Sequence, residues 1–594
     1  SVGGTVNFGG NVSIAGTLTY EDVTNIDAVG LITARSGIVI GSATTLSVDN
    51  IFTTGIITAT SLSVNGIDIG RGLAAVATNT AVGNNALDAN TTGNNNTAIG
   101  NEALGANTTG TRGTAVGSDA ALSNTTGSSP TAVGCFALRS NTTGDYNVAM
   151  GEGALYTNTT GSNNTAVGYA ALDNSTTSSN NTAFGYKTLD ANTTGANNVA
   201  VGAEALESNV TGNDNTAVGR QSLEQNTGDS NTAVGRLALF QNTSGTQNVA
   251  VGALALDANT TADYNTAIGY ESLSANTTGN SNTAVGNGSL ISNTTGNTNS
   301  ALGRNSLYYN TTGGNNSAFG RSALQNNTTA SNNSAFGYNA LVANTTGTQN
   351  TALGAFALDT NTTANNNTGL GYKSLEATTT GSQNTSVGAH SLDANTTGAE
   401  NTACGYDALS DNTTGQGNLG VGAYALADNT TGGSNVAMGY LALFKNTTAN
   451  SNTAVGYAAL KENTTGTQNT AVGHRALDTN TTANNNVAIG HDSLTANTTG
   501  ANNTSVGTNS MLNNTTASHN VAVGYKSLEA NTTGTENVAV GSFALDANTT
   551  AIEMTGVGYE CLSSNTTGSY NTAVGRKAMV SNVGGGRNTA MGVD

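Results

Sequence analysis

Small and apolar residues recur along this chain at a fixed spacing. Residues 79–95 read NTAVGNNALDANTTGNN, and the pattern then begins again, so that the glycine of the AVG core returns every 17 residues from Gly83 to Gly592. The spacing shortens once, to 16 residues, between Gly219 and Gly235. A fixed short period is typical of a solenoid, in which each repeat forms one coil. The glycines predict about 31 coils, which occupy residues 73–594.

Within one unit, the pattern predicts two short strands and two turns. The Thr-Ala-Val run, residues 80–82 in the first unit, has high β propensity, and Gly83 permits the positive φ of a sharp corner. Ala86-Leu87 is predicted to be the second strand, and the Asn-Thr-Thr-Gly after it is typical of a turn. The Ala-Leu-Asp-Ala segment is too short to nucleate a helix. The fold class is therefore all-β, a parallel β-solenoid.

Two apolar columns are predicted to form the interior of the coil. The position before the corner glycine is always Val, Ile, Leu, Phe, Met or Cys, and the Leu of the second strand changes only to Ala or Met. The residue before Val is nearly always Ala, which indicates that another backbone lies close to that face of the strand. One Val and one Leu contribute only about 3–6 kcal/mol of apolar transfer per coil. We therefore expect the Ala column to pack against sister chains in a homotrimer.

Residues 1–72 lack the 17-residue unit. They contain short alternating segments separated by glycine, such as Val6-Asn7-Phe8 and Val12-Ser13-Ile14. An end coil exposes unpaired strand edges, so a solenoid needs a cap. The sequence predicts an N-terminal β module or cap at residues 1–72 and a rod at residues 73–594.

Composition excludes several classes of partner. The net charge is −19, only 9% of residues are charged, and the basic residues are scattered singly, which argues against nucleic-acid binding. No apolar run is long enough to span a membrane, so membrane insertion is not expected. The three cysteines occupy different positions in the unit and are at least about 40 Å apart at the spacing of stacked strands, which rules out a disulfide within one chain.

Tyrosine follows the corner glycine in ten units, where it forms a candidate surface for stacking on host sugars. The alternative is that these rings only cover the edge of the coil. The candidates for sugar stacking are Tyr169, Tyr186, Tyr406, Tyr440 and Tyr457.

Other chemistry is not predicted. His474 and His491 occupy the same position in consecutive coils and should stack about 4.8 Å apart, but without a third ligand no metal site is predicted. Asn-Thr-Thr matches the N-glycosylation acceptor in nearly every unit, yet the motif is the turn itself, so we interpret it as a ladder of Asn and Thr side chains. The residues outside the repeat pattern provide no catalytic triad, phosphate loop or carboxylate pair. The sequence therefore predicts neither an enzyme nor a cofactor.

These units resemble the heads of trimeric YadA-type adhesins, whose coils also run through an Ala-Val/Ile-Gly corner, and the 17-residue unit is similar to repeats of phage tail-fibre proteins. The leader, GTLTYEDVTNID at residues 16–27 and GLITARSG at residues 30–37, resembles structural proteins of marine cyanophages. The resemblance covers essentially the whole chain and implies a trimeric left-handed parallel β-roll on a virion fibre. The chain departs from the adhesins in lacking a coiled-coil stalk and membrane anchor, and from many tail fibres in lacking a self-cleaving C-terminal chaperone domain.

The leading expectation is a virion fibre, a stiff extracellular rod for host attachment. Its partners would be itself as a homotrimer, other virion proteins at its N-terminal end, and a host surface glycan or receptor. The alternative is a bacterial surface adhesin or extracellular matrix filament that binds along its length. An ice-binding solenoid is a third hypothesis, but its threonines should lie in Thr-x-Thr form on a flat strand, whereas Thr91 and Thr92 are adjacent at a turn.

Overall fold

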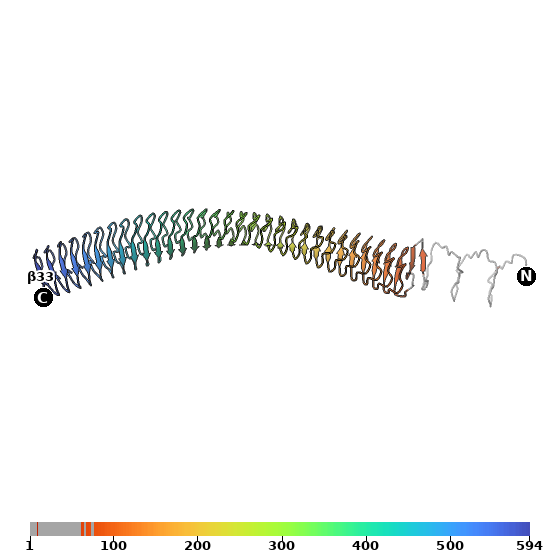
Figure 1. The fold of residues 1–594 in the computed structure, drawn as a ribbon, viewed down its shortest axis with the longest axis horizontal. Coiled ribbons are helices and arrows are strands. Elements are labelled where there is room, and N and C mark those ends of the chain that lie inside the picture. The colour runs from red at the N-terminus through yellow and green to blue at the C-terminus, as the bar shows by residue number, and fades with distance from the viewer. Residues whose placement is uncertain (1–8, 10–60, 65–66, 73–75, 594) are drawn as a thin grey trace. The chain divides into compact units, whose positions relative to one another are not determined.

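The computed structural model describes residue 9 and residues 61–64, 67–72 and 76–593 of the chain. That part contains no helix, but two strands of four residues, β1 (Ser61–Val64) and β2 (Ile67–Gly70), and 31 strands of three residues. Each short strand occupies the three residues before a corner glycine, from β3 (Thr80–Val82) to β33 (Thr589–Met591). Every short strand pairs in parallel and in register with the next, so the coils form one continuous stack (Figure 1). The parallel β-solenoid with a 17-residue period is confirmed.

The predicted N-terminal module at residues 1–72 lies largely outside the described residues. Two strands within it are described: β1 pairs antiparallel with β2, and β2 pairs antiparallel with β3. Both strands belong to the same compact unit as the coils, Thr60–Asp594. The antiparallel partner covers the edge of β3 that the coils themselves would leave unpaired.

Each coil contains one strand rather than the two that were predicted. The Leu of every unit lies in a turn with left-handed backbone, for example Leu87 with φ 54° and Leu341 with φ 52°. Such a conformation costs L-residues about 1–2 kcal/mol, and it prevents the regular extension that a strand requires. Hydrogen bonds to the next coil hold the turn in place, since the backbone N–H of Leu87 donates to the carbonyl oxygen of Ala103 at 3.1 Å.

The predicted orientation of the strand is also wrong. The Ala column faces the interior and is fully buried, as at Ala98, whereas the neighbouring Ile99 is 40% exposed and Phe184 is 55% exposed. The interior is narrow because the Leu and two Asn side chains of each coil already fill it. Only a small side chain fits beside them: a methyl group built on Gly369, at the Ala position, would lie 3.2 Å from the carbonyl oxygen of Ser374 and 3.5 Å from Leu358. The Ala column is therefore the core of the chain and not a surface for sister chains.

Two columns of buried asparagine complete the interior. In the column that begins the Asn-Thr-Thr turn, Nδ2 of Asn107 donates to Oδ1 of Asn90 at 3.0 Å and to the carbonyl oxygen of Gly110 at 3.1 Å. In the column that precedes the strand, Oδ1 of Asn164 accepts from the backbone N–H of Asn181 at 3.0 Å. These amide ladders satisfy polar groups that burial would otherwise leave without partners.

The Thr side chains of the turn form the expected ladder. In most turns the first Thr donates to the carbonyl oxygen of its counterpart one coil on, for example from Oγ1 of Thr91 to Thr108 at 2.9 Å. The Asn of this motif is fully buried at Asn107 and in most other coils, so the sequon is not accessible to glycosylation there. The interpretation of Asn-Thr-Thr as a structural ladder is confirmed.

The shortened unit keeps its register. Val218 of β11 (Thr216–Val218) pairs with Val234 of β12 (Thr232–Val234), as in every regular coil. The missing residue is absorbed in the turn, where Nδ2 of Asn226 donates to the carbonyl oxygen of Gly228, two residues ahead instead of three. The prediction that a turn absorbs the deletion is confirmed.

Candidate functional site

The corner glycine places the residue after it on the outer surface of the coil. All ten tyrosines at this position are exposed, with between 43% and 50% of each side chain accessible. The five candidates predicted from the sequence fall into two separate groups. Tyr169 and Tyr186 stack on each other, with ring centroids 5.6 Å apart and an interplanar angle of 13°. Tyr406, Tyr440 and Tyr457 belong to a much longer run of rings.

This run, which we call the aromatic strip, crosses ten consecutive coils without a gap. Neighbouring ring centroids are 4.7–6.3 Å apart, within the range of aromatic contact. Its members are Tyr338, Phe356, Tyr372, His390, Tyr406, Tyr424, Tyr440, Tyr457, His474 and His491.

The first part of the aromatic strip alternates between two positions of the unit. Where one coil has Gly-Tyr, the next has Gly-Ala followed by an aromatic residue, as in Ala355-Phe356, Ala389-His390 and Ala423-Tyr424. Each ring at the second position lies nearly perpendicular to the tyrosines before and after it, at interplanar angles of 77–85°. Sequence reasoning missed these three rings because it compared residues at a single position of the 17-residue unit. A 34-residue period, two coils long, was the signal in the sequence that would have revealed them.

Charged groups lie beside the rings. The Arg321 guanidinium lies 5.7 Å from the centroid of Tyr338, and Nζ of Lys373 lies 5.8 Å from the centroid of Tyr372. A hydrogen bond with Glu376, whose Oε1 is 3.1 Å from that Nζ, raises the pKa of Lys373. Burial raises the pKa of Asp393, although a hydrogen bond with His390 opposes the shift. The strip therefore combines apolar ring surface with cations and carboxylates.

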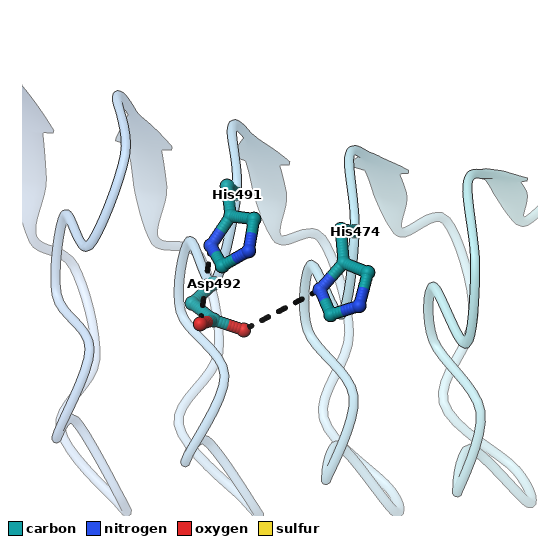
Figure 2. Close-up of side chains that lie close together, drawn as sticks. All are labelled: His474, His491 and Asp492. Carbon is teal, nitrogen blue, oxygen red and sulfur yellow. Dashed lines mark ion pairs between the residues drawn. The ribbon is translucent and has the colours of Figure 1, made fainter.

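The strip ends in a pair of stacked imidazoles. The rings of His474 and His491 have centroids 4.7 Å apart and are inclined by only 8°, as the shared position in consecutive coils predicted. Asp492 turns its carboxylate toward both rings (Figure 2), with Oδ2 3.1 Å from Nδ1 of His491 and Oδ1 4.0 Å from Nδ1 of His474. Sequence reasoning found no third ligand because it compared only equivalent positions, whereas Asp492 directly follows His491.

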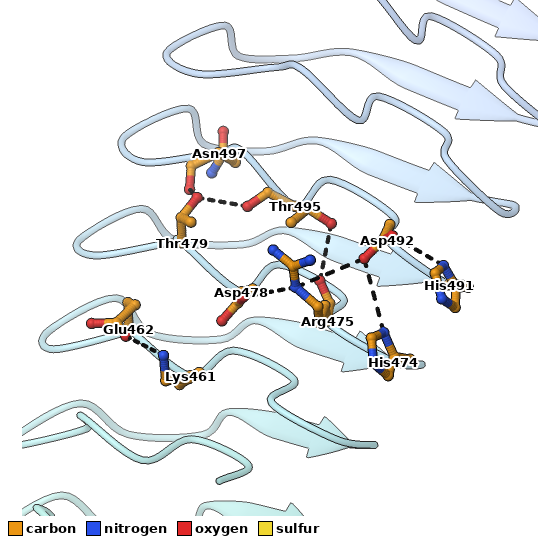
Figure 3. Close-up of polar contacts among 10 residues, drawn as sticks. All are labelled: Lys461, Glu462, His474, Arg475, Asp478, Thr479, His491, Asp492, Thr495 and Asn497. Carbon is orange, nitrogen blue, oxygen red and sulfur yellow. Dashed lines mark hydrogen bonds and ion pairs between the residues drawn. The ribbon is translucent and has the colours of Figure 1, made fainter.

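Arg475 lies beside this cluster but has its own partner. Its Nε is 3.2 Å from Oδ2 of Asp478 and 4.0 Å from Oδ1 of Asp492 (Figure 3). A side-chain hydrogen bond ties this coil to the next, since Oγ1 of Thr495 donates to the carbonyl oxygen of Arg475 at 3.0 Å. An open hollow of about 450 Å³ adjoins the cluster and is lined by Leu441, Tyr457, Ala458, Lys461, His474, Arg475 and Asp478.

A second, smaller hollow lies in the early coils. Its volume is about 170 Å³, and it is lined by Phe136, Glu152, Gly153, Tyr156, Tyr169, Ala170 and Asp173. Both hollows pair a tyrosine of the corner position with a carboxylate. Aromatic rings can stack on the apolar C–H face of a sugar, and carboxylates can accept hydrogen bonds from its hydroxyl groups. Each hollow therefore places an exposed ring beside hydrogen-bond acceptors.

No protein-family model and no curated protein matches this chain. Within the part of the chain that the structure describes, no helix has the length and hydrophobicity needed to cross a membrane. The function is accordingly inferred from the coils and their surface.

Proposed function

We propose that this chain is a structural fibre protein of a virion, a stiff extracellular rod for host attachment that carries out no catalysis and needs no cofactor. The observation that carries the proposal is the unbroken, in-register ladder from β3 to β33. Neighbouring coils are joined by strand hydrogen bonds, by Asn ladders and by Thr ladders, so bending the stack strains bonds on several sides of each coil. Such construction suits a part that must hold a position far from its base.

The surface of the rod supports attachment to a glycan. The first seven rings of the aromatic strip repeat every two coils, which is about 10 Å at the spacing of parallel strands. That interval is close to the length of a disaccharide in an extended polysaccharide. An extended host polysaccharide lying along the coils would therefore meet the same arrangement of rings at each repeat.

The rod also presents a face suited to a second copy of itself. The two outward positions of β3 to β33 are occupied by Thr, Ser, Val, Ile, Leu, Met, Phe or Cys, and none of these strands has a charged residue there. With the coils stacked about 4.8 Å apart, the strand face of one chain has an area on the order of 1,000 Å². A standard protein–protein interface buries about 800 Å² on each partner. A partner with the same coil spacing fits it along its whole length, so we propose a homotrimer that packs through this face.

Immunolabelling tests the fibre function. Antibodies raised against the chain should label fibres on virus particles in electron micrographs of the native source. Labelling of bacterial surfaces without particles would favour the alternative, a surface adhesin or extracellular matrix filament.

Variants then test the glycan surface. Replacing Tyr372, Tyr406 and Tyr440 together with Ala should weaken binding of the full chain to host polysaccharide at least about tenfold, since each stacked ring contributes roughly 1 kcal/mol or more. Tyr264→Ala is the matched control, because Tyr264 is exposed but lies outside the aromatic strip. Equal binding by the triple variant and the wild type would contradict the proposal.

A further inference from the structure

We propose that His474, His491 and Asp492 bind a divalent transition-metal ion of the Zn²⁺ or Ni²⁺ type. One ligand atom from each residue lies within 4.8 Å of the others, and this is the one such group of three in the part of the chain that the structure describes. The proposal is independent of the attachment function.

The donor set suits such an ion. Imidazole nitrogen and carboxylate oxygen bind Zn²⁺ at about 2.0–2.2 Å, which places the ligand atoms of a tetrahedral site roughly 3.3 Å apart. Closing the cluster from its present spacing requires a shift of less than about 1 Å per ligand atom. Both histidine side chains are about half exposed, at 45% and 54%, so their rings are free to make that movement.

The solenoid fixes the backbone of the site in advance. The two histidines follow β26 (Thr470–Val472) and β27 (Val487–Ile489), which pair in register, and the backbone N–H of Asp492 donates to the carbonyl oxygen of His474 at 2.9 Å. Binding therefore orders only side chains. An ion held by three protein ligands keeps a further position for water, as in catalytic zinc sites.

Charge around the cluster is compatible with a bound cation. Arg475 is the nearest competing cation, but its closer partner is Asp478, at 3.2 Å against 4.0 Å for Asp492. The Asp492 carboxylate is thus shared mainly by the two imidazoles. Because an imidazole must be neutral to bind a metal, acid should weaken binding.

The test is calorimetric titration of the metal-stripped full chain with ZnCl₂ and with NiCl₂ near neutral pH. We expect saturable binding of one ion per chain, weakened at least about tenfold by His474→Gln or by His491→Gln. His390→Gln and His519→Gln are controls, because each removes a histidine outside the cluster and should leave the titration unchanged.

Three results would overturn the site. The first is the absence of saturable binding at millimolar ion. The second is wild-type affinity in both cluster variants. The third is loss of binding in the His390 or His519 variant. Circular dichroism of each variant establishes that the solenoid is intact, so a lost titration reports the ligands and not the fold.

Discussion

Asparagine controls the interior of each coil at the level of single residues. Nδ2 of Asn327 donates to Oδ1 of Asn310 at 2.7 Å and to the carbonyl oxygen of Ala330 at 3.0 Å, and this pattern repeats along the stack. A buried amide that loses its partner costs about 1–3 kcal/mol. Departures from the Asn column are therefore local weak points.

Thr378 is such a departure. It replaces the Asn of the turn, and within the described residues Oδ1 of Asn361, one coil earlier, is buried without a hydrogen-bond donor. Thr378→Asn should restore the ladder and stabilise the adjoining coils by about 1 kcal/mol. Native-state hydrogen exchange of the amides around β20 (Thr368–Leu370) and β21 (Thr385–Val387) measures this. Thr378→Val, which leaves the amide unpaired, should not slow exchange; equal protection by both variants would contradict the explanation.

Asp546 is a second weak point, and its effect depends on pH. Burial raises its pKa from 3.8 to about 6, and its Oδ1 has no partner among the described residues. The folded chain binds this proton more tightly than the unfolded chain does, so stability is lost as pH rises from about 4 through 6. Asp546→Asn should therefore slow hydrogen exchange nearby at pH 7.5, and its advantage should shrink through pH 6 and vanish below about 4. An advantage of constant size at all pH values would rule out the carboxyl as its source.

At the level of the element, the coil depends on its corner glycine. Gly405 has φ 146°, and a methyl group there would lie 2.5 Å from the carbonyl oxygen of Gly422 in the next coil. Both the backbone conformation and the stacking of corners therefore exclude a side chain.

Alanine substitutions at a corner glycine and at a turn glycine of the same region compare how much each position depends on glycine. Gly405→Ala should destabilise the adjoining coils by at least about 2 kcal/mol. Gly398→Ala is the control and should cost less than Gly405→Ala. A methyl group built there would also lie 2.4 Å from a carbonyl oxygen, that of Gly415, but the backbone is not left-handed, and Ala449 at the equivalent position shows that the turn accommodates Ala in other coils. Limited proteolysis followed by mass spectrometry locates any opened coil. Equal cleavage of the two variants would contradict this role of the corner.

The sequence predicted the coil better than it predicted the direction of its side chains. The period, the strand at residues 80–82, the turn chemistry and the register across the shortened unit follow from local preferences and from repetition. Alternation along a strand separates Ala from Val, but it does not say which of the two faces inward. That choice depends on space: Leu87 and the two buried Asn columns leave room only for a small side chain, which is nearly always Ala and is Ser at Ser386 and Ser505. Asp492 was missed for a similar reason, since its carboxylate joins the histidines only through the fold of the coil.

At the level of the whole molecule, the side chains that face outward from the strand determine which surface can contact another copy of the chain. Ala233 is buried inside the coil, so Ala233→Glu would disrupt the coil itself and would not report on assembly. A test of assembly must instead change residues that face outward from the strand. Replacing both Phe184 and Leu353 with Lys should lower the assembled mass in light scattering while the circular dichroism stays unchanged, because two unpaired charges per chain would be buried in the contact. Tyr264→Lys, at an exposed residue outside the strands, is the control; an unchanged mass in the double variant would argue against the strand face as the interface.

The length of the rod tests the central claim most directly. Thirty intervals between 31 corners, at about 4.8 Å each, give a coil region about 145 Å long. Electron micrographs of the purified full chain should show a straight or gently curved element of that length and of uniform width. A compact particle, or an elongated one much shorter than this, would contradict the solenoid and the fibre function proposed from it.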